Sequence, residues 1–193
     1  MSIHKVSGDG NCLFNSIAYG IIYHTRVEEA LKNASKLQSS IKIKKPSKTE
    51  YKQLAVILRK EATNYMSKKI KSSKGKNFAF MLAGTYAEEN NINNFTSKEL
   101  TNEEIQRRAR KYIKLMRQDG EWAGEIELIA LSNFIHELGF KGVKVTGVQP
   151  METKMKMSNQ MPIIDVRWIG RCHYDFLAPR VKRSIASVKR MRN

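Results

Sequence analysis

The sequence predicts a single α+β domain in which the helices come first and the strands come last. Apolar residues recur at helical spacing through most of the first 139 residues, whereas three short segments after residue 141 are rich in β-branched and aromatic residues. The chain has 193 residues, of which 41% are hydrophobic, and this length and composition suit one domain with its own core. We therefore expect a small central β-sheet packed between helices.

The first helix is expected to begin near Cys12, because Leu13, Ile17 and Ile21 recur on one face at helical spacing. The segment 26–37 predicts a second helical piece. Further along, "SKTE" and "TNEE" match the capping box, in which a Ser or Thr and a Glu three residues later bond each other's backbone N–H groups. The remaining helices are predicted from 47 to a polar break at 71–76, at 78–89, from 101, and at 126–139 with a glycine to end it.

Three strands are predicted at 142–148, 162–169 and 173–178, and residues 151–161 are expected to connect the first two. No apolar run of about 18 residues is present, so we expect no membrane span. No secretory signal is recognisable, and two cysteines without one are expected to be free thiols in a reducing compartment. An intracellular, cytoplasmic protein without cofactor or metal is therefore expected.

The net charge of +17 is concentrated in two segments. Residues 36–76 hold thirteen basic and two acidic side chains, and residues 180–193 hold six basic ones and no acid. The rest of the chain is balanced, with 16 basic and 16 acidic side chains. One interpretation is a solvated lysine-rich surface, and the other is a binding surface for nucleic acid, anionic lipid or another anionic partner. Zinc-finger spacing and RNA-binding aromatic motifs are absent from the sequence.

The segment "VSGDGNCLFNSIAYG" (6–20) places a cysteine where a glycine-rich turn meets the start of a helix. A helix N-terminus lowers the pKa of a thiol, because its unpaired N–H groups favour negative charge. Gly8 and Gly10 allow a sharp turn whose N–H groups can stabilise the oxyanion that forms when a thiolate attacks a carbonyl. The alternative for Cys12 is a buried cysteine at the start of an ordinary helix.

A nucleophilic thiolate needs a general base, and His173 is the best candidate because Asp175 lies two residues further on the same predicted strand. The carboxylate is expected to hold the imidazole Nδ1–H and leave Nε2 facing the thiolate. Cys172 then points the opposite way and is expected in the core, and two cysteines without a second pair of ligands do not indicate zinc. The other three histidines are expected at the surface or the edge of the core: His4, His24 and His136.

Three motifs occur in a recognisable order: "DGNCLF" at Asp9–Phe14, "W-x-G-x-x-E-L" at Trp122–Leu128, and "HYD" at His173–Asp175. Together they resemble the ovarian tumour (OTU) family of cysteine deubiquitinases, over residues 6–178. The resemblance implies a single papain-like OTU domain at 1–179, followed by a basic tail or the start of a linker at 180–193.

The family resemblance also implies the chemistry. Ubiquitin or polyubiquitin is the implied partner, with ubiquitin-like modifiers as further candidates, and the implied reaction is hydrolysis of the isopeptide bond after the C-terminal glycine of ubiquitin. Cys12 corresponds to the nucleophile, His173 to the general base and Asp175 to the acid that orients it. Asp9 matches an aspartate sometimes named as catalytic, and we expect it to support the oxyanion loop formed by Asp9, Gly10, Asn11 and Cys12.

The middle motif departs from the usual Trp-Gly-Gly, because Ala123 follows Trp122, and Asn15 stands where Arg or Tyr is commoner. Both changes concern specificity more than activity. Trp122 is expected to be a packing anchor and Glu127 an acid at a helix start. By sequence proximity to the site, Trp122 and Glu125, together with Glu121, are candidates for substrate binding.

Two alternative functions remain at this point: a ubiquitin-binding or basic scaffold protein without turnover, and a viral thiol protease that processes a polyprotein. The presence of Cys12, His173 and Asp175 favours the enzyme. A composition rich in Lys, Asn and Ile suggests an AT-rich genome, and hence a viral or bacterial effector that acts in a host cytoplasm.

Overall fold

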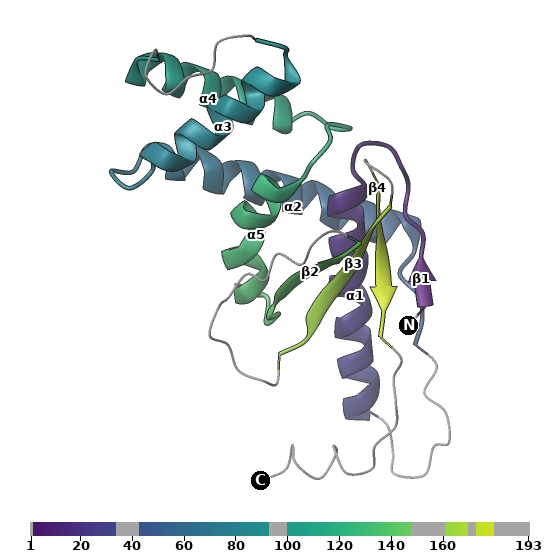
Figure 1. Cartoon of the computed structure of the whole chain (residues 1–193). Helices are drawn as coiled ribbons and strands as arrows, with labels where there is room; N and C mark the ends of the chain where they lie inside the picture. The colour runs from purple at the N-terminus through teal and green to yellow at the C-terminus, as the bar shows by residue number, and fades with distance from the viewer. Residues whose placement is uncertain (1, 34–42, 93–99, 148–160, 170–172, 180–193) are drawn as a thin grey trace.

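The computed structural model describes residues 2–33, 43–92, 100–147, 161–169 and 173–179. Over these residues the chain folds into five helices and one four-stranded sheet, as Figure 1 shows. The predicted α+β order is confirmed. The elements are β1 (Ser2–His4), α1 (Cys12–Asn33), α2 (Lys48–Lys69), α3 (Lys76–Glu89), α4 (Asn102–Met116), α5 (Glu125–Glu137), β2 (Gly142–Thr146), β3 (Ile163–Ile169) and β4 (His173–Ala178).

Helix α1 begins at Cys12, as predicted, but the division into two helical pieces is wrong within the described residues. The helix is continuous to Asn33, and within it the hydroxyl of Thr25 donates to the carbonyl oxygen of Ile21 (3.0 Å), so this polar residue is accommodated without a break. Gly20 is needed for packing, because a methyl group there would lie 2.6 Å from a side-chain carbon of Ile164 on the sheet. The end of the predicted piece, residues 34–37, lies outside the described residues.

The capping predictions are confirmed in full for α2 and in part for α4. At α2, Ser47 accepts from the N–H of Glu50 (3.3 Å), and Glu50 accepts from the N–H of Ser47 (2.7 Å). At α4, Thr101 accepts from the N–H of Glu104 (3.2 Å), but the carboxylate of Glu104 binds the side chains of Arg107 and Arg108. The electrostatic attraction of two guanidinium groups outweighs the return bond of a capping box.

Helix α5 ends as its glycine predicts. Gly139 has a φ of +85°, a conformation that residues with a side chain rarely adopt. Its N–H donates to the oxygen of His136 (2.9 Å), and the N–H of Phe140 donates to that of Ile135 (3.2 Å). These two bonds form a Schellman motif, which turns the chain from α5 towards β2.

The sheet has the strand order β1-β4-β3-β2, in which β2 is parallel to β3 and the other pairs are antiparallel. The three predicted strands are confirmed within a few residues, whereas β1 was not predicted. It has only three residues, too few for a periodic pattern, and it pairs with β4 at the opposite end of the sequence. The predicted connection at 151–161 lies almost wholly outside the described residues.

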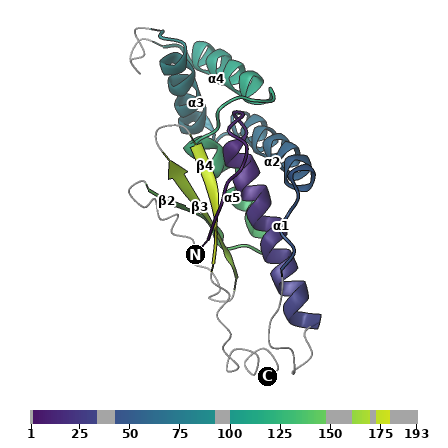
Figure 2. The same ribbon diagram turned by 90° about the vertical axis from the view of Figure 1, so that its right-hand side faces the viewer.

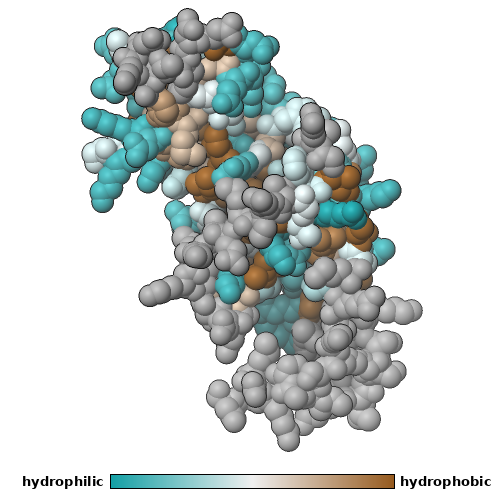
Figure 3. Space-filling model, in the orientation of Figure 1, coloured by the Kyte–Doolittle hydropathy of each residue, from teal (hydrophilic) through white to brown (hydrophobic). Residues whose placement is uncertain are grey.

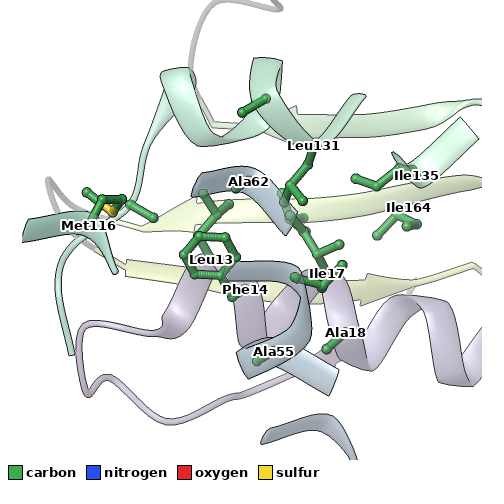
Figure 4. Packing of buried hydrophobic residues seen from close by; sticks show 14 of the residues in the cluster. Leu13, Phe14, Ile17, Ala18, Ala55, Ala62, Met116, Leu131, Ile135 and Ile164 are labelled. Atoms are coloured by element: carbon green, nitrogen blue, oxygen red, sulfur yellow. The ribbon is translucent and has the colours of Figure 1, made fainter. Parts of the chain in front are cut away.

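Helix α1 runs along one face of the sheet, while α3 and α4 pack together beyond α2 (Figures 1 and 2). The core includes residues of the N-terminal turns of α1 together with residues of α2, α5 and β3 (Figure 4). Leu13, Phe14 and Ile17 are fully buried there, together with Leu131 of α5 and Ile164 of β3. The start of α1 is therefore held in place on several sides.

The surface seen in Figure 3 has hydrophobic areas separated by hydrophilic side chains. The exposed large hydrophobic residues include Val56 and Ile57 on α2 and Trp122 before α5. None of the helices in the described ranges is both long and apolar enough to cross a membrane. The predicted basic tail, residues 180–193, lies outside the described residues.

Candidate active site

Cys12 is the first residue of α1 and follows a tight turn at residues 8–11. Gly10 has a φ of +76°, which favours glycine, and the carbonyl of Asn11 accepts the N–H of Asn15 (2.8 Å) in the first turn of the helix. The side chain of Cys12 is buried, with 1% of the residue exposed. Loop and helix therefore place a thiol at a helix N-terminus, as predicted.

The expected lowering of the Cys12 pKa is wrong in direction. Burial raises the pKa of the Cys12 thiol above its usual value, and the charge of Asp9 adds to this. Backbone hydrogen bonds from Tyr174, Leu13 and Cys12 itself lower the pKa, as a helix N-terminus should, but they do not offset the burial. Sequence showed the helix start, but not that the thiol faces the core, where an ion is poorly solvated.

His173 and Asp175 form the predicted pair at the start of β4. The Oδ1 atom of Asp175 lies 2.9 Å from Nε2 of His173 and also accepts the N–H of Val6 (3.1 Å). The prediction that Nδ1 faces the carboxylate is wrong. Nδ1 instead faces the turn before α1. A methyl group added at Gly8, in that turn, would lie 3.5 Å from it. Asp175 is 1% exposed, so its carboxylate is held rigidly.

Strand β4 is attached to α1 beside these groups. The hydroxyl of Ser16 donates to the carbonyl oxygen of Tyr174 (2.9 Å), across 158 residues of sequence. The backbone of Tyr174 also hydrogen-bonds the thiol of Cys12. Tyr174 lies between His173 and Asp175, so these contacts place the strand that carries the His–Asp pair against the start of the helix that carries Cys12. Cys172, predicted in the core, lies outside the described residues.

Asp9 lies in the turn, with its carboxylate directed towards α2. It accepts from Nζ of Lys52 (2.7 Å), from Nδ2 of the buried Asn15 (3.3 Å) and from the N–H of Asn11 (3.4 Å). Burial opposes its ionisation, but the bond to Lys52 and the other donors outweigh it and lower the pKa of Asp9. These contacts suit an acid that holds the turn. Its role in catalysis stays a prediction.

The middle motif lies in the loop 117–124 and at the start of α5. Glu127 is an acid at a helix start, as expected: it accepts the N–H of Gly124 (2.7 Å) and the hydroxyl of Tyr112 (2.9 Å). Burial raises the pKa of Glu127. The prediction that Trp122 is a packing anchor is wrong, because 51% of it is exposed. Glu125 is also exposed, so both candidates for substrate binding are accessible.

The turn and the loop 117–124 contact each other closely at two glycines. A methyl group on Gly10 would lie 1.6 Å from the carbonyl oxygen of Gly120. Arg59 of α2, which sequence analysis missed, lies behind this contact and is 5% exposed. It donates to Asn11 Oδ1 (2.8 Å) and to the carbonyl oxygen of Glu121 (2.6 Å). Its only sequence signal is a cation at a buried position of an amphipathic helix.

The described part of the chain contains no group of three or more His, Cys, Asp or Glu residues placed to hold a metal ion. The chemistry that the site can perform comes from a thiol, an imidazole and a carboxylate. These are the three groups of a thiol hydrolase, in which the imidazole takes the proton of the thiol and the acid orients the imidazole.

The family model described as OTU-like cysteine protease matches residues 7–138. This range contains Cys12 and the motif at 122–128, whereas His173 and Asp175 lie beyond it. A comparison with curated proteins returns no match.

Proposed function

The chain belongs to the family of OTU-like cysteine proteases, and on this basis we propose that it is a deubiquitinase that hydrolyses the isopeptide bond at the C-terminus of ubiquitin. The observation that carries the proposal is the arrangement of one thiol at the start of α1 and one His–Asp pair on the strand that its helix contacts. Membership of the family identifies the protein as a cysteine peptidase. That its substrate is ubiquitin is our proposal.

In the proposed reaction, His173 acts first as a general base. Because burial raises the pKa of Cys12, the resting thiol is neutral, and the proton leaves as the sulfur attacks the substrate carbonyl. With Nε2 directed to Asp175, the proton moves to Nδ1. Asp175 stabilises the imidazolium that forms, because it presents a buried negative charge at 2.9 Å.

The carbonyl oxygen of the substrate becomes negative when sulfur attacks carbon. We assign its stabilisation to N–H groups of the turn at Gly10 and Cys12, with Asp9, which accepts the N–H of Asn11, as the acid that holds this turn. The imidazolium then protonates the departing lysine amine, and the thioester between Cys12 and ubiquitin remains. Water, deprotonated by His173, hydrolyses the thioester and restores the thiol.

Substrate binding is assigned to the surface beside the middle motif. Trp122 offers an exposed aromatic side chain, and Glu125 an exposed acid at the start of α5. The apolar recognition surface of ubiquitin is surrounded by basic side chains, so an acid beside an aromatic ring is complementary to it. The lysine-rich segments are not.

The decisive experiment uses ubiquitin with an electrophile at its C-terminus. We expect the wild type to be labelled once, at Cys12, as measured by intact mass and peptide mapping. Cys12→Ala should abolish both labelling and cleavage of diubiquitin while leaving the thermal unfolding transition and ubiquitin binding in place. The matched control is Cys172→Ala, which should be labelled like the wild type.

Labelling at Cys172 would overturn the assignment of the nucleophile. Binding of ubiquitin without labelling or cleavage would instead identify a binding protein without turnover. A panel of diubiquitins of all linkages, together with ubiquitin-like modifiers bearing the same electrophile, then defines the substrate. If none of these substrates is cleaved, the proposed function is refuted.

A further inference from the structure

Arg59 is a buried arginine whose hydrogen-bonding partners are electrically neutral. One terminal nitrogen donates to the carbonyl oxygen of Met116 (2.8 Å). The other donates to the carbonyl oxygen of Glu121 (2.6 Å) and to Oδ1 of Asn11 (2.8 Å). The guanidinium carbon lies 4.6 Å from the centre of the Phe14 ring. A charge buried without a carboxylate in direct contact is costly, and only the more distant carboxylates of Asp119, Glu127, Glu121 and Asp9 offset that cost electrostatically.

Two of the four partners of Arg59 flank Cys12 in the sequence, and the other two belong to the end of α4 and the loop after it. Asn11 immediately precedes Cys12, and Phe14 lies in the first turn of the same helix. Met116 ends α4, and Glu121 lies in the loop that leads to Trp122. Phe14 and Met116 are both labelled in Figure 4 among the buried residues of the core. A single guanidinium therefore joins α2, the turn before Cys12, the end of α4 and the loop 117–124.

Asn11 is the point at which this network reaches the turn. Its Oδ1 atom accepts from Arg59, and its Nδ2 atom donates to Asp119 Oδ1 (2.9 Å) and to the backbone carbonyl oxygen of Asp9 (3.4 Å). The N–H of Gly120 also points to Asn11 Oδ1, at 3.5 Å. The Asn11 side chain thus spans the turn and the loop, and Arg59 fixes which way its amide group faces.

We propose that Arg59 is a positioning residue that clamps the turn at residues 8–11 to the loop 117–124 and so holds the N–H groups before Cys12 in place for the reaction. The inference rests on the proposed function for its kinetic consequence, although the clamp itself can be measured without a substrate. A planar group with several fixed N–H donors suits this task, because it reaches three acceptors and stacks on a ring at the same time. A lysine ammonium cannot bind these three acceptors and stack on the ring at the same time.

The test compares Arg59→Met with Arg26→Met. Arg26 also links α1 to α2, through Glu50 and the carbonyl oxygen of Lys44 (3.3 Å), but it does not contact the turn or the loop. Both changes remove one positive charge and keep a long side chain. Hydrogen exchange measured by mass spectrometry should rise by at least tenfold in peptides covering 8–11 and 117–124 for Arg59→Met, and should stay at the wild-type rate there for Arg26→Met.

The kinetic expectation is a loss of turnover rather than of affinity. With a fluorogenic ubiquitin substrate, Arg59→Met should lower kcat at least tenfold while KM changes less than threefold, because the turn acts on the transition state. Arg26→Met should keep kcat within threefold of the wild type. Exchange unchanged at both segments, or equal kcat losses in the two variants, would overturn the proposal.

Arg59→Lys keeps the charge and serves where Arg59→Met does not fold. We expect it to remain folded but to show the same exchange at 8–11 and the same fall in kcat, since one ammonium cannot replace the branched contact. Full activity and full protection of Arg59→Lys would refute the clamp. If the wild type cleaves no ubiquitin substrate, the proposed function fails, and the exchange measurements still decide whether Arg59 clamps the two segments.

Discussion

Some side chains at this site make more than one functional contact, and Asp175 is the clearest example. One of its carboxylate oxygens meets both the His173 ring and the N–H of Val6, and the residue is almost fully buried. Asp9, by contrast, has a side chain that is 38% exposed and is paired with Lys52. Its partners belong to the turn and to the helices around it. The contacts therefore favour Asp175 as the acid that orients the base.

Replacing the two acids separately tests this assignment. Asp175→Asn should lower kcat/KM by about a hundredfold or more, the scale seen when an orienting acid is neutralised in a catalytic triad. The oxygen of the asparagine can still accept the N–H of Val6, so we expect the fold to survive. Asp9→Asn should lower kcat/KM by a smaller factor. Steady-state hydrolysis of a ubiquitin substrate measures both, and a fully active Asp175→Asn would refute the assignment.

At the level of elements, the site depends on two loops that touch through backbone atoms. The turn before α1 and the loop before α5 approach so closely at Gly10 and Gly120 that no side chain fits between them. The loop is in turn held by Glu127, which caps the start of α5 and is bonded to Tyr112 of α4. Gly10 of the first motif, Gly120 just before the middle motif and Glu127 within it thus belong to one structural unit.

Gly10→Ala should disrupt this unit. The added methyl group would overlap the carbonyl oxygen of Gly120, and a φ of +76° disfavours alanine. We expect a loss of stability of about 2 kcal/mol or more in urea denaturation, within the upper range for single substitutions. Gly120→Ala is the matched control, because its φ of +87° disfavours alanine equally while the new methyl group would lie 3.5 Å from the carbonyl oxygen of Asp9, an ordinary contact. Similar stability of the two variants would contradict the packing described.

At the scale of the whole molecule, half-buried histidines make folding sensitive to pH. The ring of His24 lies among Phe140, Phe176 and Tyr23, and its Nε2 atom has no partner among the described residues. Burial lowers the pKa of His24 below the usual 6.5, and the bond to the backbone of Ile163 only partly offsets this. The pKa of His4 is lowered as well, by burial and by the charge of Lys45.

The sign of the effect follows from the lowered pKa. Above about pH 6.5, His24 is neutral in both the folded and the unfolded protein. As the pH falls below that value, the unfolded chain takes up the proton first. Stability is therefore complete at pH 7.5 and declines towards pH 5.5. We expect the urea midpoint to fall over this range, and to fall less in His24→Gln. His136→Gln, at an exposed position of α5, is the control. An identical decline in His24→Gln and the wild type would contradict this account.

The division of the chain into a catalytic domain at 1–179 and a basic tail at 180–193 remains a proposal. The six basic residues of the tail would serve an anionic partner. Removal of 180–193 should change hydrolysis of a minimal ubiquitin substrate by less than about threefold, a shift of under about 1 kcal/mol in the barrier. The same truncation should weaken retention on heparin, in a way that depends on salt. Loss of diubiquitin cleavage in a folded truncated protein would place the tail in the substrate site.

The sequence by itself determined the helices, the three later strands and the candidates Cys12, His173 and Asp175. Helical spacing, capping residues and β-branched runs are local signals, so they survive without knowledge of the fold. The order of three short motifs adds the family, because their residue types are set by the chemistry of the site. Even the glutamate of the middle motif was predictable as an acid at a helix start.

Only the tertiary structure decided how these groups meet. The pairing of β1 with β4, the direction of the Cys12 pKa and the nitrogen of His173 that faces Asp175 all depend on contacts between residues far apart in the sequence. The same holds for Arg59, whose role comes from acceptors on three other segments. Burial and orientation are properties of the whole packed chain, and no local pattern encodes them.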